Sequence, residues 1–122
     1  RRGGAQQLAR VFEAGIARIF PDRQIVDIAD TDEIFHVLYD MDERVQVPGI
    51  QYWYSGRTWE RDGIDPKWRG IYDDKGRLMM AIHHNMDLGD AWEWADHPSY
   101  PEAWASQAYR TGINSIIYAM TH

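Results

Sequence analysis

The chain has 122 residues, of which 44% are hydrophobic and 26% charged, so it fits one domain with a small hydrophobic core. Its net charge of -6 disfavours nucleic acid as a partner, and its longest apolar runs, of about five residues, are far shorter than the roughly 20 residues of a membrane-spanning helix. The absence of cysteine excludes disulfides, zinc–thiolate sites and a cysteine nucleophile.

The chain starts with Arg1-Arg2-Gly3-Gly4, which has neither an initiator Met nor the apolar segment of a signal peptide. We interpret this start as a cut end and expect the chain to be a fragment of a longer protein. The first predicted element is a helix over residues 5–20, which stops at Pro21. Its apolar residues recur at steps of three and four: Leu8, Val11, Phe12, Ile16, Ile19 and Phe20.

The next segments predict short elements. Residues 24–28 are rich in isoleucine and valine, which indicates a strand. A helical turn follows and reaches His36, with Asp30 or Thr31 as its cap. The chain changes direction at Pro48-Gly49, and the composition of residues 50–54 (IQYWY) then predicts a second strand.

A β-hairpin is the clearest local signal. Residues 68–72 and 77–83 flank the turn Asp73-Asp74-Lys75-Gly76, in which glycine suits a positive φ. A short helix is expected over residues 87–93. A final helix follows over residues 101–120, with Pro101 in its first turn and a kink or division at Gly112.

These elements predict a sheet covered by helices, which is an α/β or α+β layer fold. The chain forms a single domain over residues 1–122. Only about four strands are expected, and the helices over residues 5–20 and 101–120 need more sheet to pack on. We therefore expect part of the domain to lie upstream of the chain.

Residues 83–93 are the strongest candidate for a functional site, because polar side chains follow an apolar strand there. Strand alternation places His83 and His84 on opposite faces, which favours His84 as the functional residue at the strand end. Asn85 follows within reach of the same pocket. Asp87, Asp90 and Glu93 share a face if this stretch is helical.

This set of side chains suits a hard or borderline divalent cation, or an acid/base pair for hydrolysis. The alternatives are structural: Asp87 caps a helix that starts at Leu88, Asn85 orders a turn, and His83 is a core residue. The spacing matches no established metal motif, so the metal stays open and the sequence requires no cofactor.

Two further features of the sequence have both a functional and a structural explanation. Trp92 belongs to a dense set of aromatic residues that suits stacking on a ligand or a partner protein, although core and rim packing explains most of the set. Arg57 and Arg69 suit a carboxylate or phosphate ligand, although salt bridges to the many nearby aspartates are the favoured explanation.

Several separated motifs resemble the C-terminal portion of the bacterial DUF4159 family of domains of unknown function. The resemblance runs from about Phe20 to the C-terminus, and the motifs occur in the order of the family. They are IFPDRQIVDI, DEIFHVLYDMDE, QVPGIQYW, GRTWER, WRGIYDDKGRLMMAIHHNMDLGDAWEWAD and YRTGINSIIYAMTH.

The resemblance implies a three-layer, flavodoxin-like sandwich, similar to class I glutamine amidotransferase and trehalose-utilisation-like domains, of which this chain is the C-terminal part. It also implies a periplasmic or cell-envelope location, since members often carry an export signal. Amidotransferase folds place a catalytic histidine after a late strand, as His84 is placed here. The family's recurring motif maps onto His84, Asn85, Asp87, Asp90, Trp92 and Glu93, and its basic motif onto Arg57, Glu60, Arg69, Asp73 and Arg77.

Two functional hypotheses follow. The preferred one is a noncatalytic or degenerate amidotransferase-like domain that binds a small ligand or a protein partner, because the chain lacks the cysteine nucleophile. Its ligand-binding candidates are Asn85, Trp92, Arg57 and Arg69. The alternative is a hydrolase, metal-assisted or not, with His84, Asp87, Asp90 and Glu93 as its catalytic residues.

Overall fold

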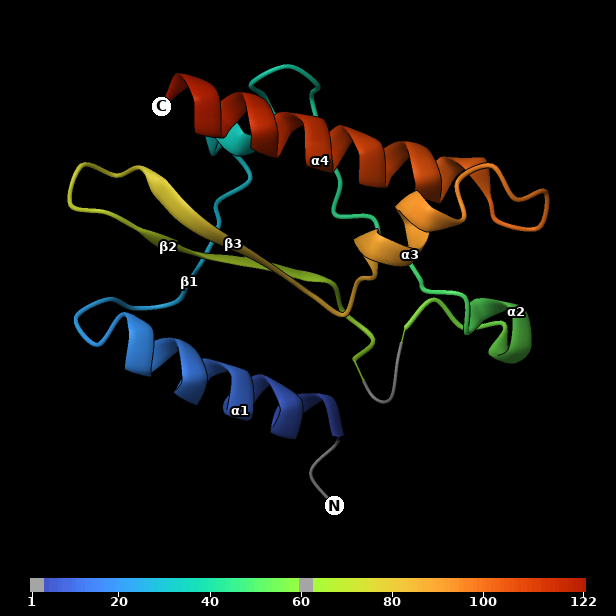
Figure 1. Cartoon of the computed structure of the whole chain (residues 1–122), viewed down its shortest axis with the longest axis horizontal. Coiled ribbons are helices and arrows are strands. Elements are labelled where there is room, and N and C mark those ends of the chain that lie inside the picture. The colour runs from blue at the N-terminus through green and yellow to red at the C-terminus, as the bar shows by residue number, and fades with distance from the viewer. Residues whose placement is uncertain (1–3, 60–62) are drawn as a thin grey trace.

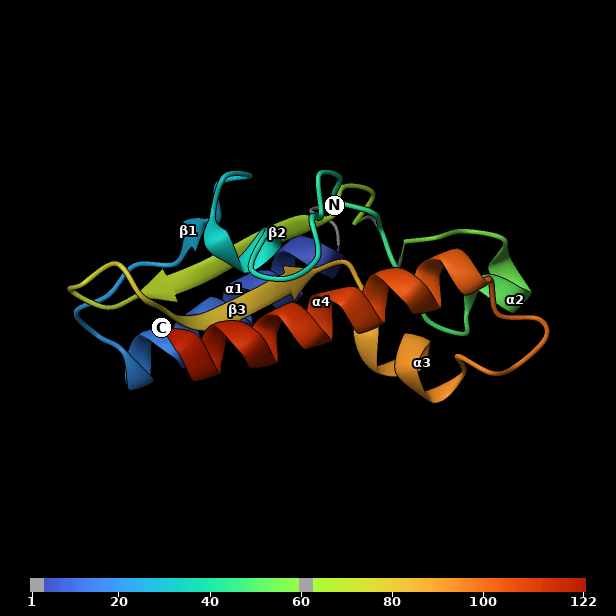
Figure 2. The same ribbon diagram turned by 90° about the horizontal axis from the view of Figure 1, so that it is seen from above.

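The computed structural model describes residues 4–59 and 63–122, in which two long helices lie on opposite faces of a small sheet. Helix α1 (Gly4–Ile19) lies below the sheet and helix α4 (Glu102–Thr121) lies above it (Figure 1). The view from above shows the same order of layers (Figure 2). None of the described helices combines the length and hydrophobicity that crossing a bilayer requires.

The sheet has three antiparallel strands in the order β1-β2-β3. They are β1 (Val26–Asp27), β2 (Lys67–Tyr72) and β3 (Leu78–His84). The predicted hairpin is therefore confirmed, with Gly76 at φ 76° in its turn. The carboxylate of Asp73 stabilises this turn by accepting hydrogen bonds from the amides of Lys75 (2.9 Å) and Arg77 (2.8 Å).

The main core lies between the sheet and α4. The Phe35 ring packs on Trp68, with 4.5 Å between ring centroids. The buried hydroxyl of Tyr118 accepts a hydrogen bond from the amide of Leu78 at 2.9 Å, which fixes α4 to the start of β3. This cluster consists of Ile28, Ile34, Phe35, Met41, Trp68, Leu78 and Tyr118.

Asn114 of α4 binds the irregular segment between β1 and β2 and holds it against the helix. Its fully buried side chain accepts from the amide of Tyr39 (2.9 Å) and donates to the carbonyls of Tyr39 (2.9 Å) and Ile34 (3.0 Å). Ile34 belongs to the 3-10 helix η1 (Glu33–Phe35). The side-chain amide of Asn114 thus supplies hydrogen-bond partners for main-chain groups that have none within this irregular segment.

A second cluster packs the short helix α3 (Leu88–Glu93) against the N-terminal half of α4. The ring of Trp92 lies over Gly112, where a Cβ atom would come within 3.1 Å of it. Glycine therefore permits this close packing, and α4 continues through it without the predicted division. The buried members of the cluster are Val47, Ala91, Tyr100, Ala105 and Ala108.

The prediction of a strand over residues 50–54 is wrong, because this segment contains the short helix α2 (Tyr52–Ser55). The Trp53 indole packs edge-on against Trp94 and donates to the carbonyl of Ser99 at 3.1 Å. Packing of the aromatic rings thus overrides their β propensity where no neighbouring strand is present. The cap of η1 is also Asp32, rather than Asp30 or Thr31, since its carboxylate accepts from the amide of Ile34 at 3.0 Å.

Helix α1 confirms the predicted first helix, but most of its apolar face is uncovered. Among the side chains of α1 that the structure describes, only Ile16 is buried, whereas those of Leu8, Val11 and Ile19 are 57%, 70% and 66% exposed. Glu13 forms a salt bridge with Arg69 of β2, which attaches the helix to the sheet. The layer formed by α1 is therefore open on one side.

We expect Asn114→Leu to lower the free energy of unfolding by about 3 kcal/mol, because it leaves one buried and two half-buried main-chain groups without a partner. Ser115→Ala is the matched control, since the Ser115 hydroxyl bonds only to the Thr111 carbonyl of its own helix. Its expected loss is below about 1 kcal/mol. Urea denaturation of both variants checks this, and equal losses would contradict the role given to Asn114.

Candidate functional site

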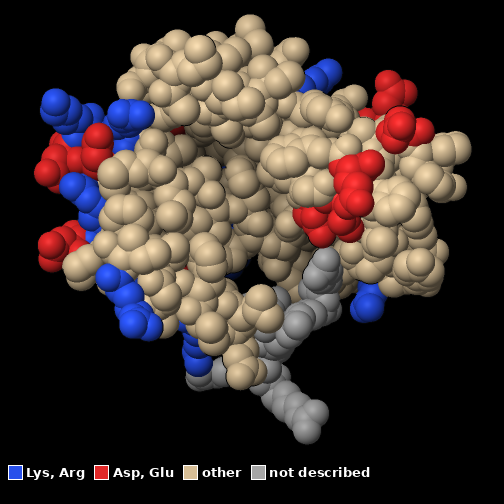
Figure 3. Space-filling model, viewed as in Figure 1, with Lys and Arg blue, Asp and Glu red and all other residues tan. Residues whose placement is uncertain are grey.

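A pocket of about 370 Å³ opens where β3 ends, between α1 and the segment that precedes α2. The face of the molecule is hollowed near its centre in this region (Figure 3). The apolar walls include Leu8 and Phe12 of α1 and Ile82 of β3. The polar lining residues are Gln51, Thr58, His83, His84, Asn85 and Asp87.

The two histidines have different surroundings, as strand alternation predicts. The ring of His83 packs edge-on against Trp68 in the core, with 4.8 Å between centroids. Burial lowers the pKa of His83 to about 4, so it is neutral at pH 7. His84 lies on the face that carries Arg69. Burial first, and then the charge of Arg69, lowers its pKa.

Several nitrogens at this pocket are buried without a hydrogen-bond partner. Within the described part of the chain these include His83 Nδ1, His84 Nε2 and Gln51 Nε2, which all belong to residues that line the pocket. An unpaired buried polar group costs about 1–3 kcal/mol relative to a paired one. Nitrogens of β3 and of the segment before α2 are therefore free to form hydrogen bonds with a ligand in the pocket.

The carboxylates of Asp87 and Asp90 stabilise the local structure. Asp87 caps α3, because its Oδ1 accepts from the amide of Asp90 at 2.9 Å. Asp90 Oδ2 accepts from the amide of Ile50 at 2.8 Å. Both carboxylates approach Gly49 so closely that a Cβ atom there would lie 2.8–2.9 Å from their oxygens. Burial and these two charges raise the pKa of Tyr100, whose hydroxyl donates to the Pro48 carbonyl.

Asn85 orders the turn between β3 and α3. It adopts a φ of 60°, which asparagine tolerates better than most residues. Its side-chain amide donates to the Asp65 carbonyl at 2.9 Å, and its own carbonyl accepts from Gln46 at 3.0 Å. The structural alternatives for Asp87 and Asn85 are therefore both present in the molecule.

The structure brings only three of the eight predicted site residues to this pocket: His84, Asn85 and Asp87. Glu93 and Trp92 lie on exposed parts of α3. Arg57 stacks over the Trp59 ring at 5.9 Å, and Arg69 forms salt bridges with Glu13 and Asp27. The eighth residue, Asp90, bonds to Ile50 as described above.

Glu60, which the basic motif includes, lies outside the described residues. Across residues 4–59 and 63–122, no group of three or more His, Asp or Glu side chains is placed to hold a metal ion. Within this part of the chain, the geometry supports binding through neutral hydrogen-bonding groups better than metal coordination.

Sequence reasoning missed the residues that reach the pocket from other segments: Leu8, Phe12, Gln51 and Thr58. The available signal was the motif QVPGIQYW, which contains Gln51 and the Pro48-Gly49 pair that approaches the carboxylates. For Leu8 and Phe12, the helical spacing predicted burial against a sheet rather than the wall of a pocket.

Comparison with known proteins identifies one family. The family model described as "Domain of unknown function (DUF4159)" matches residues 2–120. No curated protein and no solved structure matches the chain.

The low pKa of His83 predicts acid destabilisation. The folded pKa is about 4, below the value of about 6.5 expected in the unfolded chain, so the unfolded state binds a proton first as the pH falls. Stability is therefore full above pH 6.5 and falls by roughly 3 kcal/mol as the pH decreases to 4. His83→Phe keeps an aromatic contact with Trp68 and removes this loss. Denaturation at several pH values checks it, and parallel curves for the two proteins would contradict it.

The capping role of Asp87 gives a separate prediction. Asp87→Ala lowers stability by about 1 kcal/mol, because the amide of Asp90 loses its acceptor. Asp87→Asn is the matched control and keeps stability within about 0.5 kcal/mol, since asparagine caps helices as well as aspartate does. Thermal unfolding checks both variants. An equal loss for alanine and asparagine would show that the negative charge, rather than the cap, is what matters.

Proposed function

The chain belongs to the DUF4159 family, and we propose that it is a noncatalytic binding domain. Its ligand is a small uncharged molecule, held in the pocket between α1 and the end of β3. The proposal includes the degenerate amidotransferase-like character that the resemblance suggests, in which a pocket remains without a cysteine nucleophile.

The observation that carries this proposal is the set of unpaired nitrogens at the pocket. Gln51 Nε2 is a hydrogen-bond donor, and each neutral histidine has one donor and one acceptor nitrogen. A ligand that pairs with these atoms recovers free energy that the free protein loses through their burial. A protein–ligand hydrogen bond is therefore worth more here than at an exposed site.

The lining also defines the ligand by its charge and polarity. Among the lining residues that the structure describes, Asp87 is the one charged side chain, and its Oδ1 already accepts the bond that caps α3. The walls formed by Leu8, Phe12 and Ile82 are apolar. These features favour a neutral molecule that carries both an apolar group and a carbonyl or amide. The volume of about 370 Å³ lies at the small end of the usual range for ligand pockets.

The flavodoxin-like sandwich is proposed as the finer description of the fold. Helices on both faces of a sheet support it, although the three strands here are antiparallel. A periplasmic or cell-envelope location rests on the family resemblance alone and is proposed with it.

The hydrolase hypothesis has less support from the geometry. Of its four residues, only His84 and Asp87 line the pocket, and Asp87 acts as a helix cap. No specific observation favours hydrolysis over binding, so binding is the function that we propose.

Benzamide tests the proposal, because it is neutral and combines an aromatic ring with an amide. We expect it to shift the NMR signals of the His83 and His84 rings and the Gln51 side-chain amide, with a Kd of about 1 mM for a ligand of this size. Ala9→Phe, which fills the pocket from α1, abolishes these shifts. Ala14→Phe is the matched control, since Ala14 is exposed on the same helix and does not line the pocket.

Two results would contradict the proposal. One is the absence of shifts at these residues up to about 10 mM benzamide, a tenfold excess over the expected Kd. The other is unchanged binding in Ala9→Phe, which would place the ligand elsewhere.

A further inference from the structure

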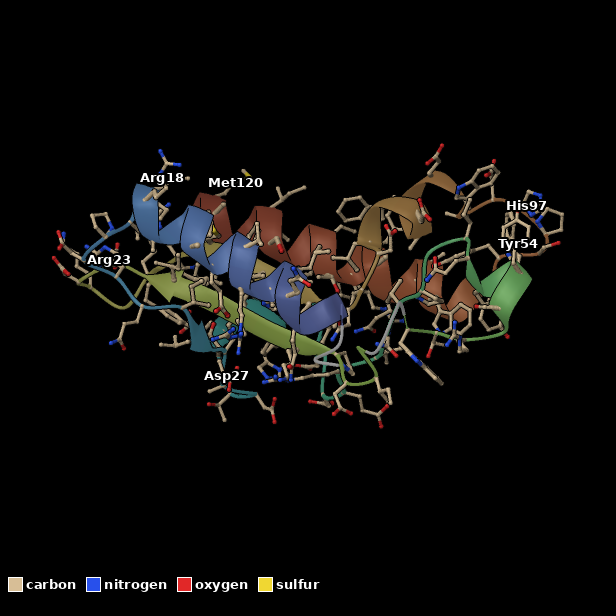
Figure 4. The ribbon with its side chains drawn as sticks, turned by 90° about the horizontal axis from the view of Figure 1, so that it is seen from below. Arg18, Arg23, Asp27, Tyr54, His97 and Met120 are labelled. Atoms are coloured by element: carbon tan, nitrogen blue, oxygen red, sulfur yellow. The ribbon has the colours of Figure 1, made fainter. Side chains whose placement is uncertain are left out.

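A second cavity, of about 310 Å³, adjoins the pocket in which we place the ligand. The two cavities share the lining residues Ala9, His84 and Asn85, so they meet where β3 ends. The second cavity lies between the N-terminal end of α1 and the start of β2. Seen from below, that end of α1 lies over the start of β2, with Arg18 near the other end of the helix (Figure 4). A ligand in the first pocket can therefore extend past His84 into the second cavity.

The lining of the second cavity is polar, in contrast to that of the first. Among its described lining residues, only Ala9 and Ile64 have apolar side chains, whereas the first pocket has apolar walls from α1 and β3. An apolar group therefore fits the first pocket, and a hydrogen-bonding group fits the second cavity. The polar side chains that line the second cavity are Gln6, Asp65, Lys67, Arg69, His84 and Asn85.

The register of the hairpin places Lys67 beside His84. These residues are partners in the pairing of β2 with β3, so their side chains share one face of the sheet, with about 5 Å between Cβ atoms. Arg69 lies two residues further along β2 on the same face. Burial has the largest effect in lowering the pKa of His84, and the charges of Arg69 and Lys67 lower it further, as this placement requires. The Lys67 ammonium and the unpaired His84 Nε2 are thus both within reach of a ligand that extends over the two cavities.

The charges around the second cavity favour a ligand group that carries no net charge. The Arg69 guanidinium forms salt bridges with Glu13 and Asp27, so its charge is offset. Lys67 and Asp65 then place one cation and one carboxylate in the lining, and within the described ranges neither forms a salt bridge. Lys67 would repel an ammonium group, and Asp65 would repel a carboxylate. An amide suits both, because its oxygen accepts from Lys67 and its N–H donates to Asp65.

We propose that the ligand is an elongated, uncharged diamide that occupies both cavities, with its apolar group in the first pocket and its second amide beside Lys67 and Asp65. The inference rests on the proposed function, because it extends the ligand of the first pocket. An amino acid that is capped at both ends has this chemistry. Lys67 and Asp65 then determine specificity for the second amide, and His84, which lines both cavities, lies between the two ends of the ligand.

Benzoylglycinamide tests this inference, because it extends benzamide by a second amide. We expect its Kd to be about tenfold lower than that of benzamide, since the second amide gains hydrogen bonds to charged groups. It shifts the NMR signals of Lys67 and Asp65, which benzamide does not reach. N-propylbenzamide has a similar length without the second amide, and its Kd stays within about threefold of that of benzamide, because the polar lining offers the propyl group few apolar contacts.

Variants of α1 and β2 locate the second amide. Gln6→Phe fills the second cavity from α1 and reduces the tenfold difference between the two ligands to about twofold or less. Gln7→Phe is the matched control, which keeps the difference, since Gln7 is exposed on the same helix and lines neither cavity. Lys67→Met keeps the bulk of the side chain without its charge, and it reduces the difference as Gln6→Phe does.

The outcomes separate this inference from the proposed function. If neither benzamide nor benzoylglycinamide binds, both are wrong. If benzamide binds but benzoylglycinamide has an equal Kd, or if Gln6→Phe keeps the difference, only the inference of a second amide site is overturned. Benzoylglycine ends in a carboxylate, so we expect it to bind more weakly than benzoylglycinamide because of Asp65. Tighter binding of benzoylglycine would overturn the uncharged end of the ligand.

Discussion

The packing of the β2–β3 hairpin against α4 is the constraint on which the rest of the structure depends. Trp68 and Leu78 supply the sheet side of the core, and the Tyr118 hydroxyl fixes the start of β3 to the helix. Asn114 adds the preceding irregular segment to the same helix. Because β1 contributes only two residues, these contacts, rather than an extensive sheet, determine where β3 runs and where it ends.

The direction of β3 then determines the site. Alternation along the strand sends His83 into the core against Trp68 and leaves His84 on the face that carries Arg69. The turn at Asn85 and the cap at Asp87 lead the chain into α3, which packs on α4. Two kinds of polar group lie at this point. The side chains of one kind form the hydrogen bonds of the turn, whereas the nitrogens of His83, His84 and Gln51 remain unpaired beside a pocket. The first accounts for the carboxylates, and the second accounts for the proposed binding.

Local signals in the sequence predicted most of the elements. The hairpin follows from the turn Asp73-Asp74-Lys75-Gly76, and the two long helices follow from apolar spacing. The strand predicted over residues 50–54 is wrong, because aromatic composition cannot show that no neighbouring strand is available there. At the site, His84, Asn85 and Asp87 were predictable from their place after a strand. Packing between distant segments keeps Arg57, Arg69 and Glu93 away from the pocket and brings Gln51 to it. One sequence does not reveal such packing.

The state of the ring nitrogens of His83 and His84 tests the central claim most directly. Nitrogen-15 NMR of the histidine rings reports which nitrogen carries the proton and whether it is hydrogen-bonded. The account predicts neutral rings at pH 7, with His83 Nδ1 and His84 Nε2 not bonded to any protein group in the free chain and with a change at His84 Nε2 when the pocket is occupied. A direct hydrogen bond from either nitrogen to a protein group in the free chain would contradict it, because the pocket would then lack one of the unpaired groups on which the proposed binding depends.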